Sequence, residues 1–427
     1  MKPDGAAQRL TPLLEEFAGS PLPVRLRAWD GSETAPGDSA EDAPLLVLRS
    51  RRALRRLLWQ PGELGLAEAY ITGDLDVEGD LAEALRTVWR TARAGGLRPP
   101  RPTPRAAARA FRVLLGLGAV GPRPPAPALR SRPKGRLHSR DRDREAVSHH
   151  YDFSNDFYAL LLDESMAYSC GYWRRPGDRA YSLADAQHDK LELVCRKLDL
   201  HPGARFLDVG CGWGSLTLHA ARHYKARVTA VTLAREQAAA VTRRVREEGL
   251  EDLVDVQLRD YRDIEPGTYD AVSSIEMGEH VGDAGYPAFA ASLHQRLRPR
   301  GRLLVQQMSR GRNAPGGGAF IETYIAPDMH MRPLGETVSL LEGASLEVRG
   351  VESLREDYVR TIAAWRRTLE ERWSEVTALI GTEAARVWRL YLVGGMLAFE
   401  EGRMGVDQIL AVRPDAEGRS GMSGGGR

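Results

Sequence analysis

The chain has 427 residues, of which 42% are hydrophobic and 28% are charged. This length predicts a catalytic domain with at least one smaller domain, because a single hydrophobic core stops growing at about 250–300 residues. The 60 Lys and Arg side chains nearly balance 58 Asp and Glu, so the charge does not indicate nucleic acid as a partner. The cysteines at 170, 195 and 211 suggest no disulfide framework, and we find neither a secretory signal nor a membrane-spanning run. We therefore expect a cytoplasmic protein.

Residues 1–95 predict a small N-terminal α+β domain. The runs VRLRAW and PLLVLRS have the character of short strands, and ALRRLLW and LAEALRTVWR have helical spacing. Residues 96–147 are rich in arginine and proline and predict a basic linker, within which Arg105–Val120 fits an amphipathic helix. Such a basic region can hold a protein near anionic lipid, although a solvated linker is the simpler interpretation.

Residues 148–415 alternate strand and helix patterns, which is typical of a doubly wound α/β sheet. The strands expected in chain order are ARFLDVG, ARVTAVTL, VDVQLRD, YDAVSSIEM and GRLLVQQMS, followed by C-terminal helices and the strand-like QILAVRP. The predicted fold class is therefore α/β, a Rossmann-like domain with added C-terminal helices beside the smaller α+β domain. Residues 416–427 predict a disordered tail.

The first of these strands ends in a glycine-rich turn, FLDVGCGWG at Phe206–Gly214. Such a turn brings backbone N–H groups close to a ligand. A dinucleotide site would need a third glycine where Ser215 stands. The turn instead suits S-adenosylmethionine, which has no pyrophosphate. Asp208 is a candidate to orient the ammonium group of that cofactor, and a turn-forming role is the alternative.

The ends of the later strands lie at the same edge of a doubly wound sheet. The residues placed there are candidates to contact the ribose and base or to carry chemistry. They are Thr232, Leu233 and Gln237 after the second strand, Tyr261 and Arg262 after the third, and Ile275 and Glu279 after the fourth.

With these segments in place, the sequence resembles the cyclopropane fatty acid synthase family. That family includes mycolic acid cyclopropane synthases and actinobacterial relatives that methylate oleoyl chains. The matching motifs include HHYDFSNDFYALLLDESMAYSCGYW, FLDVGCGWG, SSIEMGEHVG, ETYIAPDMHMRP and FEEGRMGVDQILAVRP. The resemblance implies methyl transfer from S-adenosylmethionine to a cis double bond in a phospholipid acyl chain, at the inner membrane face.

The resemblance also assigns residues to roles. Cofactor contacts carried over are Tyr168, Ser169, Gly210, Gly212, Thr232, Leu233, Gln237, Tyr261, Arg262 and Ile275. The acid–base site of the family, which holds a bicarbonate ion, corresponds to Cys170, Glu279 and Tyr358. Two positions depart, because LVQQM stands where cyclopropane synthases have leucine-leucine-histidine-threonine-isoleucine. Gln306 thus replaces the bicarbonate-contacting histidine and Met308 replaces the isoleucine. No metal is implied.

Methylation of an alkene creates a carbocation, which requires apolar walls and one base. Candidate walls are Tyr151, Phe153, Phe157, Tyr158, Tyr172 and Trp173, and all of these equally fit an ordinary core. A nucleophilic Cys170 is disfavoured because no activating histidine is evident.

Several readings of the function remain open at this level. Gln306 cannot carry a proton as histidine can, which favours a methylene-branched product and then a separate reductase. True cyclopropanation is the main alternative. A methyltransferase for a small polar acceptor and a non-catalytic lipid-binding protein are the others. The sequence allows a homo-oligomer.

Overall fold

The computed structural model describes residues 5–34, 43–94, 103–130, 142, 155–266, 269–313 and 316–422. The chain divides into two compact units. The first contains Met1–Arg130 with Gly318–Phe320 and Gly381–Leu397, and the second contains the remaining residues. Within the predicted basic linker, residues 103–130 and 142 are described, while the predicted wall residues Tyr151 and Phe153 lie outside the described residues.

The first unit is a small α+β structure, as predicted. Its helices are α1 (Ala6–Ala18), α2 (Arg51–Trp59), α3 (Glu63–Ile71), α4 (Leu81–Ala94) and α5 (Pro104–Gly116), and its strands are β1 (Arg25–Arg27), β2 (Glu33–Thr34), β3 (Leu45–Leu48) and β4 (Leu75–Glu78). The strands form one sheet in the order β2-β1-β3-β4. Its core includes Leu10, Leu26 and Leu54. The helix α5 lies within the predicted amphipathic segment, and its Val113 and Leu114 pack against this core.

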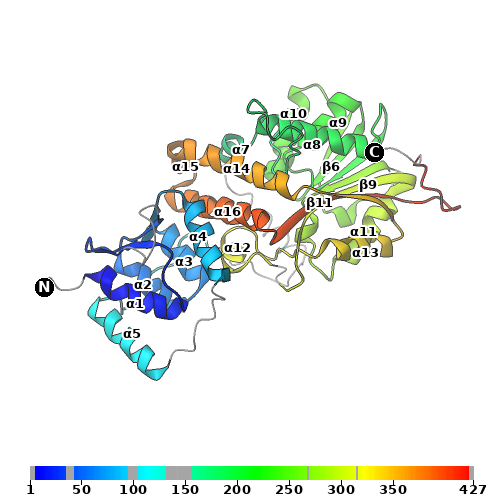
Figure 1. Cartoon of the computed structure of the whole chain (residues 1–427). Helices are drawn as coiled ribbons and strands as arrows, with labels where there is room; N and C mark the ends of the chain where they lie inside the picture. Colours follow the sequence, from blue (N-terminus) through cyan, green and yellow to red (C-terminus); the bar gives the residue numbers. More distant parts are fainter. Residues whose placement is uncertain are drawn as a thin grey trace. The chain divides into compact units, whose positions relative to one another are not determined.

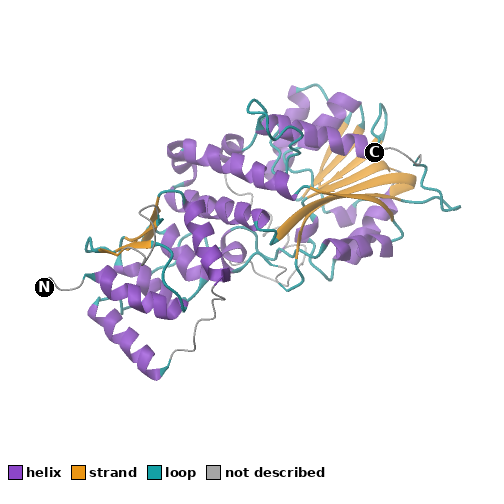
Figure 2. Ribbon diagram, in the orientation of Figure 1, coloured by secondary structure: helices purple, strands orange, loops and turns teal. Residues whose placement is uncertain are grey.

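The second unit contains a seven-stranded sheet, which Figure 2 shows in orange among helices. Its strands are β5 (Arg205–Val209), β6 (Arg227–Thr232), β7 (Val254–Leu258), β8 (Tyr269–Ile275), β9 (Leu297–Arg310), β10 (Glu347–Ser353) and β11 (Met404–Val412). The order is β10-β11-β9-β8-β5-β6-β7. The five strands from β7 to β9 are parallel, and β11 runs antiparallel to both β9 and β10. The doubly wound sheet predicted from the sequence is confirmed.

Helices cover both faces of this sheet (Figure 1). Alternate strand residues point to opposite faces, so Phe206 packs under one layer and its neighbour Leu207 under the other. The first layer contains α8 (Leu183–Lys197), α9 (Ser215–Tyr224) and α10 (Arg235–Glu247), and the second contains α11 (Tyr286–Arg296) and α13 (Leu334–Gly343). The buried sheet is the rigid support that positions the loops at its carboxyl edge.

The remaining helices are either short or lie between β10 and β11 in the chain. They are α7 (Asn155–Leu161), α12 (Ala319–Tyr324), α14 (Arg355–Glu371), α15 (Trp373–Ile380) and α16 (Thr382–Glu400), with 3-10 turns η1 (Tyr261–Asp263) and η2 (Gly278–His280). Among the described residues, no helix is both long enough and apolar enough to cross a membrane. The first residues of the predicted tail form a turn in which the backbone N–H of Arg419 donates to Asp415.

Candidate active site

The turn after β5 has a left-handed backbone at its glycines. The φ angle is +81° at Gly210, +55° at Gly212 and +83° at Gly214, a region that residues with a side chain rarely adopt. A Cβ on Gly210 would also lie 3.1 Å from Met277 Cγ. The turn therefore requires glycine for its conformation and, at Gly210, for a close approach.

A cavity of about 330 Å³ opens at the carboxyl ends of β5, β6 and β8, a volume that suits a small-molecule ligand. Every residue that the sequence predicts as a cofactor contact lines this cavity. They are Tyr168, Ser169, Asp208, Gly210, Gly212, Thr232, Leu233, Gln237, Tyr261, Arg262 and Ile275. The residues present fit S-adenosylmethionine, since a glycine turn, polar groups and apolar walls surround one space.

Asp208 is buried at the base of the cavity, and protein groups already use both of its oxygens. Thr217 Oγ1 donates to Oδ2 at 2.7 Å, and Ser273 Oγ donates to Oδ1 at 2.8 Å. Burial raises the pKa of Asp208 above its usual value. These bonds tie β5 to α9 and β8, so Asp208 stabilises the turn. Its predicted contact with the cofactor ammonium group stays a prediction.

Lys190 is a cavity residue that the sequence reasoning missed. It lies on α8 with only 2% of its surface exposed, and its Nζ donates to Ser169 Oγ at 3.0 Å. Burial lowers the pKa of Lys190. A buried ammonium group on the cavity wall can bind an anionic group such as a carboxylate. In the sequence, charged residues surround Lys190, and such a pattern predicts a lysine exposed to solvent on a helix.

The opposite side of the cavity is built by the ends of β6 and β7. Thr232 Oγ1 donates to Gln237 Oε1 at 2.8 Å, which fixes the start of α10. Arg262 donates to Asp260 through its backbone and its guanidinium group, at 2.6–2.9 Å. These bonds hold η1, and with it Tyr261, against the cavity.

Glu276 is the second cavity residue that the sequence reasoning missed. It follows β8 directly, and three donors converge on its carboxylate. The backbone N–H of Cys170 and the amide of Gln306 each donate to Oε1 at 2.8 Å, and Tyr358 OH donates to Oε2 at 2.6 Å. Burial raises the pKa of Glu276, while these hydrogen bonds and Lys190 oppose that shift.

Glu279 lies one turn further on, in η2, and is 1% exposed. Its Oε1 accepts from the backbone N–H of Met308 at 2.5 Å, and its Oε2 has no hydrogen-bond partner among the described residues. Burial, and next the charge of Glu276, raise the pKa of Glu279 to about 8. Glu279 is therefore largely protonated at neutral pH.

The predicted catalytic residues surround the cavity without lining it. Glu276 lines the cavity. The five residues predicted to be catalytic do not: Cys170, Glu279, Gln306, Met308 and Tyr358. The thiol of Cys170 is fully buried and donates to the carbonyl of Gly171 at 3.2 Å. Burial raises the pKa of this thiol well above its usual value. This agrees with the sequence reasoning, which disfavoured Cys170 as a nucleophile.

The predicted aromatic walls are also set back from the cavity. Phe157 and Tyr158 are fully buried, and the ring of Tyr158 packs 4.4 Å from that of Trp213 and 5.6 Å from that of Tyr168. Trp213 and Tyr168 are the aromatic residues that line this side. Phe157 and Tyr158 thus support the wall from behind.

A bicarbonate ion does not fit the described side chains. The groups that would bind it at Cys170, Gln306 and Tyr358 already donate to the Glu276 carboxylate. The other residue predicted to bind bicarbonate is Glu279, and one of its carboxyl oxygens already accepts a hydrogen bond from the Met308 N–H. A second anion beside Glu276 would meet a like charge with no free donor among these groups.

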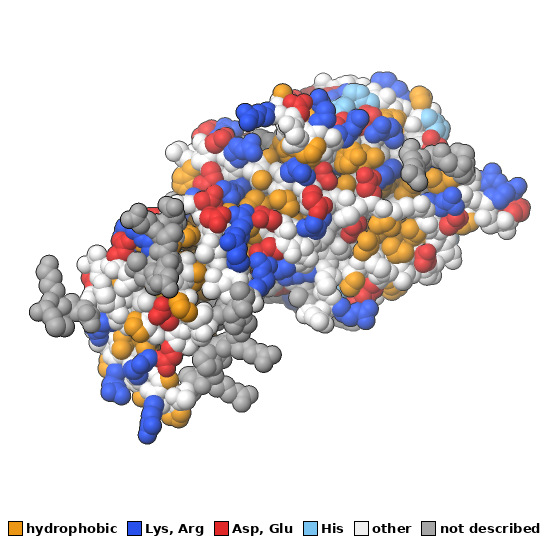
Figure 3. Space-filling view, in the orientation of Figure 1, with side chains coloured by type: hydrophobic (Ala, Val, Ile, Leu, Met, Phe, Trp, Pro, Cys, Tyr) orange, Lys and Arg blue, Asp and Glu red, His pale blue; other side chains and the backbone are white. Residues whose placement is uncertain are grey.

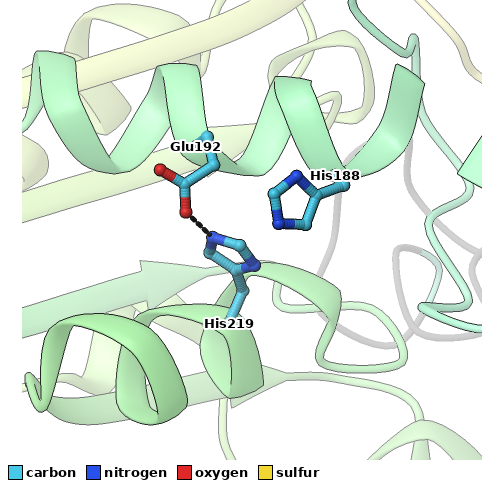
Figure 4. A group of neighbouring side chains, drawn as sticks. All are labelled: His188, Glu192 and His219. Atoms are coloured by element: carbon cyan, nitrogen blue, oxygen red, sulfur yellow. Dashed lines mark hydrogen bonds and ion pairs between the residues drawn. The ribbon is translucent and has the colours of Figure 1, made fainter. Parts of the chain in front are cut away.

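A separate group of polar side chains joins α8 to α9 outside the cavity (Figure 4). His219 Nε2 lies 2.7 Å from Glu192 Oε1, and Tyr224 OH donates to Glu192 Oε2 at 2.9 Å. His188 lies beside this pair. Each of the three residues, His188, Glu192 and His219, has one atom that could bind a metal ion, and these atoms lie within 4.8 Å of one another. Burial lowers the pKa of His219 to about 4, so a neutral imidazole and a carboxylate tie the two helices together.

The sheet order, the glycine turn and the cavity at the carboxyl edge together define an S-adenosylmethionine-dependent methyltransferase. Residues 138–409 match the family model described as mycolic acid cyclopropane synthetase. The chain belongs to this family and is an S-adenosylmethionine-dependent fatty acid methyltransferase. This assignment excludes two functions that the sequence alone left open, a non-catalytic lipid-binding protein and a methyltransferase for a small polar acceptor.

Curated relatives are similar over nearly the whole chain. A probable fatty acid methyltransferase of Pseudomonas putida is 38% identical over 93% of both chains. Tuberculostearic acid methyltransferase UfaA1 of Mycobacterium tuberculosis is 32% identical over 92% of this chain and 88% of the relative. Among solved structures, the cyclopropane synthase MmaA2 of Mycobacterium tuberculosis is 30% identical with a TM-score of 0.59, over 63% of this chain and 97% of that one. Cyclopropane synthase CmaA1 complexed with SAH and CTAB has the same TM-score.

Proposed function

We propose that the chain methylates the cis double bond of an oleoyl-type acyl chain in a phospholipid and releases a methylene-branched product. S-adenosylmethionine supplies an electrophilic methyl group when it is bound in the cavity. The assignment of an acyl-chain alkene draws support from the family and from the names of its relatives, which include UfaA1 and the cyclopropane-fatty-acyl-phospholipid synthase of Escherichia coli.

The reaction requires control of one proton. With S-adenosylmethionine bound, the alkene electrons would form a bond to the methyl carbon while the bond from that carbon to sulfur breaks and the thioether leaves. The other alkene carbon then becomes a cation. A hydride shift moves the cation to the carbon that bears the new methyl group. Loss of a proton from this methyl leaves its C–H electrons as the second bond of a methylene group. If the proton leaves before the shift, the same electrons close a cyclopropane ring.

The main support for a methylene-branched product comes from the environment of Gln306. Its amide donates to Glu276 at 2.8 Å, in the place where the cyclopropane synthases have a histidine. An amide cannot take up or release a proton at neutral pH, whereas imidazole can. Proton removal is therefore confined to fewer groups, which lengthens the life of the cation and favours the hydride shift.

The test uses the purified chain with S-adenosylmethionine and vesicles of dioleoyl phosphatidylglycerol. The methylene-branched and cyclopropane products have the same mass, so mass alone does not distinguish them. The acyl chains are therefore converted to methyl esters and measured by proton NMR, in which a methylene group gives alkene protons and a cyclopropane gives shielded protons. We expect the methylene ester. A cyclopropane as the sole new product would contradict the proposal, and Gln306→His should raise the cyclopropane share.

We further propose that the product passes to a separate reductase and that the enzyme works at a membrane surface. Reduction of the methylene group requires a hydride donor, which this reaction does not supply. Contact with a membrane gives access to the acyl chain. Support comes from α5, where Phe111 and Leu115 are each 56% exposed beside the exposed Arg105 and Arg112. Figure 3 shows hydrophobic and basic side chains interspersed over α5.

A further inference from the structure

The carboxylate of Glu276 is held by groups from three distant parts of the chain. Cys170 precedes it by 106 residues, Gln306 follows by 30 and Tyr358 by 82. A carboxylate has about four lone-pair sites. Cys170 and Gln306 use the two sites of Oε1, and Tyr358 uses one site of Oε2. Among the described residues, these donors leave one site on Oε2 of a side chain that lines the cavity.

The backbone at Glu276 also fixes the position of this side chain. Its φ is +50°, which is unusual for a residue other than glycine, and its N–H donates to the carbonyl of Gln306 at 2.6 Å. A backbone held in this conformation is strained, and such strain is typical of functional sites. The strained turn directs the carboxylate toward the cavity at the end of β8.

A chain of hydrogen bonds determines which way the Gln306 amide faces. Lys197 Nζ, which only donates, lies 2.7 Å from Gln408 Oε1. Gln408 Nε2 must then donate, and it lies 2.9 Å from Gln306 Oε1. Gln306 Nε2 is thereby turned toward Glu276. The Lys197 cation thus reinforces the donor that holds the carboxylate.

The two neighbouring carboxyl groups differ in the charge that their surroundings support. Glu276 has three donors and the ammonium group of Lys190 to stabilise its anion. Glu279 has one backbone donor, is almost fully buried and is opposed by the charge of Glu276. Such a pair separates into one ionised and one protonated group. Glu276 is the ionised member and lies on the cavity wall.

We infer that Glu276 is the general base of the reaction, a carboxylate built into the chain where the resemblance leads one to expect a bound bicarbonate ion. This inference rests on the proposed function. Glu276 Oε2 accepts the proton from the newly attached methyl group, the C–H electrons become the methylene double bond, and the protonated acid then returns its proton to water. Gln306, Tyr358 and the Cys170 N–H hold the base in position. The reaction accordingly needs no bicarbonate.

The test compares the full-length wild-type enzyme with Glu276→Gln and Glu276→Ala, using dioleoyl phosphatidylglycerol vesicles in buffer freed of carbon dioxide. We expect wild-type turnover to be the same with and without added bicarbonate. Both variants should lose at least about a hundredfold in turnover, the range of general base catalysis. S-adenosylmethionine binding, measured by calorimetry, should stay within about threefold of wild type. Glu342→Ala, an exposed carboxylate on α13, is the control.

Chemical rescue provides a second readout. Glu276→Ala leaves space beside the three donors, so bicarbonate or formate should restore at least about a tenth of the lost turnover, whereas Glu276→Gln fills that space and should gain nothing. Wild-type turnover that depends on bicarbonate, or a Glu276→Gln variant that keeps more than a tenth of it, overturns the inference. A wild-type enzyme that binds S-adenosylmethionine but methylates no acyl chain refutes the proposed function instead.

Discussion

At the scale of single residues, Glu279 is a carboxyl group in surroundings that disfavour its charge. In the unfolded chain it ionises near pH 4.5, while its folded pKa of about 8 keeps the proton bound. Its stabilising contribution is thus complete below about pH 4.5. Between these pKa values each rise of one pH unit favours the unfolded chain by about 1.4 kcal/mol. We predict that Glu279→Gln, which has no charge to bury, is more stable than wild type at about pH 8.

Calorimetric melting temperatures at several pH values test this prediction. The advantage of Glu279→Gln should grow from about pH 5 to about pH 8, because in this range only the wild type releases a proton when it unfolds. The glutamine oxygen can still accept from the Met308 N–H. A difference that is constant or shrinks with rising pH would show that Glu279 is already ionised in the folded enzyme.

The cofactor-binding residues could be predicted from the sequence, but the central carboxylate could not. Thr232, Tyr261 and their companions follow strands, and strand ends in a doubly wound sheet share one edge. Glu276 also follows a strand. Its importance, however, comes from donors at 170, 306 and 358, which only the folded chain brings together. Local sequence carries no signal for such a convergence, and an unusual φ is equally invisible in it.

Among the elements, the turn between β5 and α9 is sensitive to an added methyl group, because its glycines have positive φ angles. We predict that Gly210→Ala destabilises the fold by about 1–3 kcal/mol through its positive φ. It should also lower S-adenosylmethionine affinity about tenfold or more, because the new Cβ displaces Met277 into the cavity. Chemical unfolding and calorimetric titration measure the two effects separately.

Gly203 provides a matched control for this substitution. It has the same φ of +81°, it precedes β5, and an added Cβ would have nothing within 4 Å. Gly203→Ala should therefore incur backbone strain alone and leave cofactor affinity unchanged. If Gly210→Ala binds the cofactor as tightly as Gly203→Ala does, close packing at the turn has no part in binding.

The elements that the sequence did not predict have physical reasons for being missed. The strand β10 has no fully buried residue and no clean alternation, because it is an edge strand with a register shift between Val348 and Gly350. The helix α3 is nearly uniformly buried and has almost no amphipathic pattern. The central strands were predictable, because short segments rich in valine and threonine, such as RVTAVT in β6, are typical of strands.

For the molecule as a whole, the proposed substrate sets a requirement. An enzyme that methylates phospholipid acyl chains must contact the membrane that contains them. Its net charge of +2 is too small to supply strong attraction overall. A local surface of arginines and exposed apolar side chains can supply it instead, since burial of each large apolar side chain contributes about 1.5–3 kcal/mol. In the first unit, α5 presents such a surface, with Val113 and Leu114 turned inward and Phe111 and Leu115 turned outward.

We predict that replacing both Phe111 and Leu115 with serine weakens binding to vesicles rich in phosphatidylglycerol by at least about tenfold. Methylation of vesicle lipids should fall in parallel, while S-adenosylmethionine binding stays unchanged. Cosedimentation with anionic and neutral vesicles measures the effect, and added salt should weaken wild-type binding because arginine attraction is screened. Leu379→Ser, at an apolar side chain 43% exposed on α15, is the control. Equal vesicle binding by the double variant and the control would assign membrane contact to another surface.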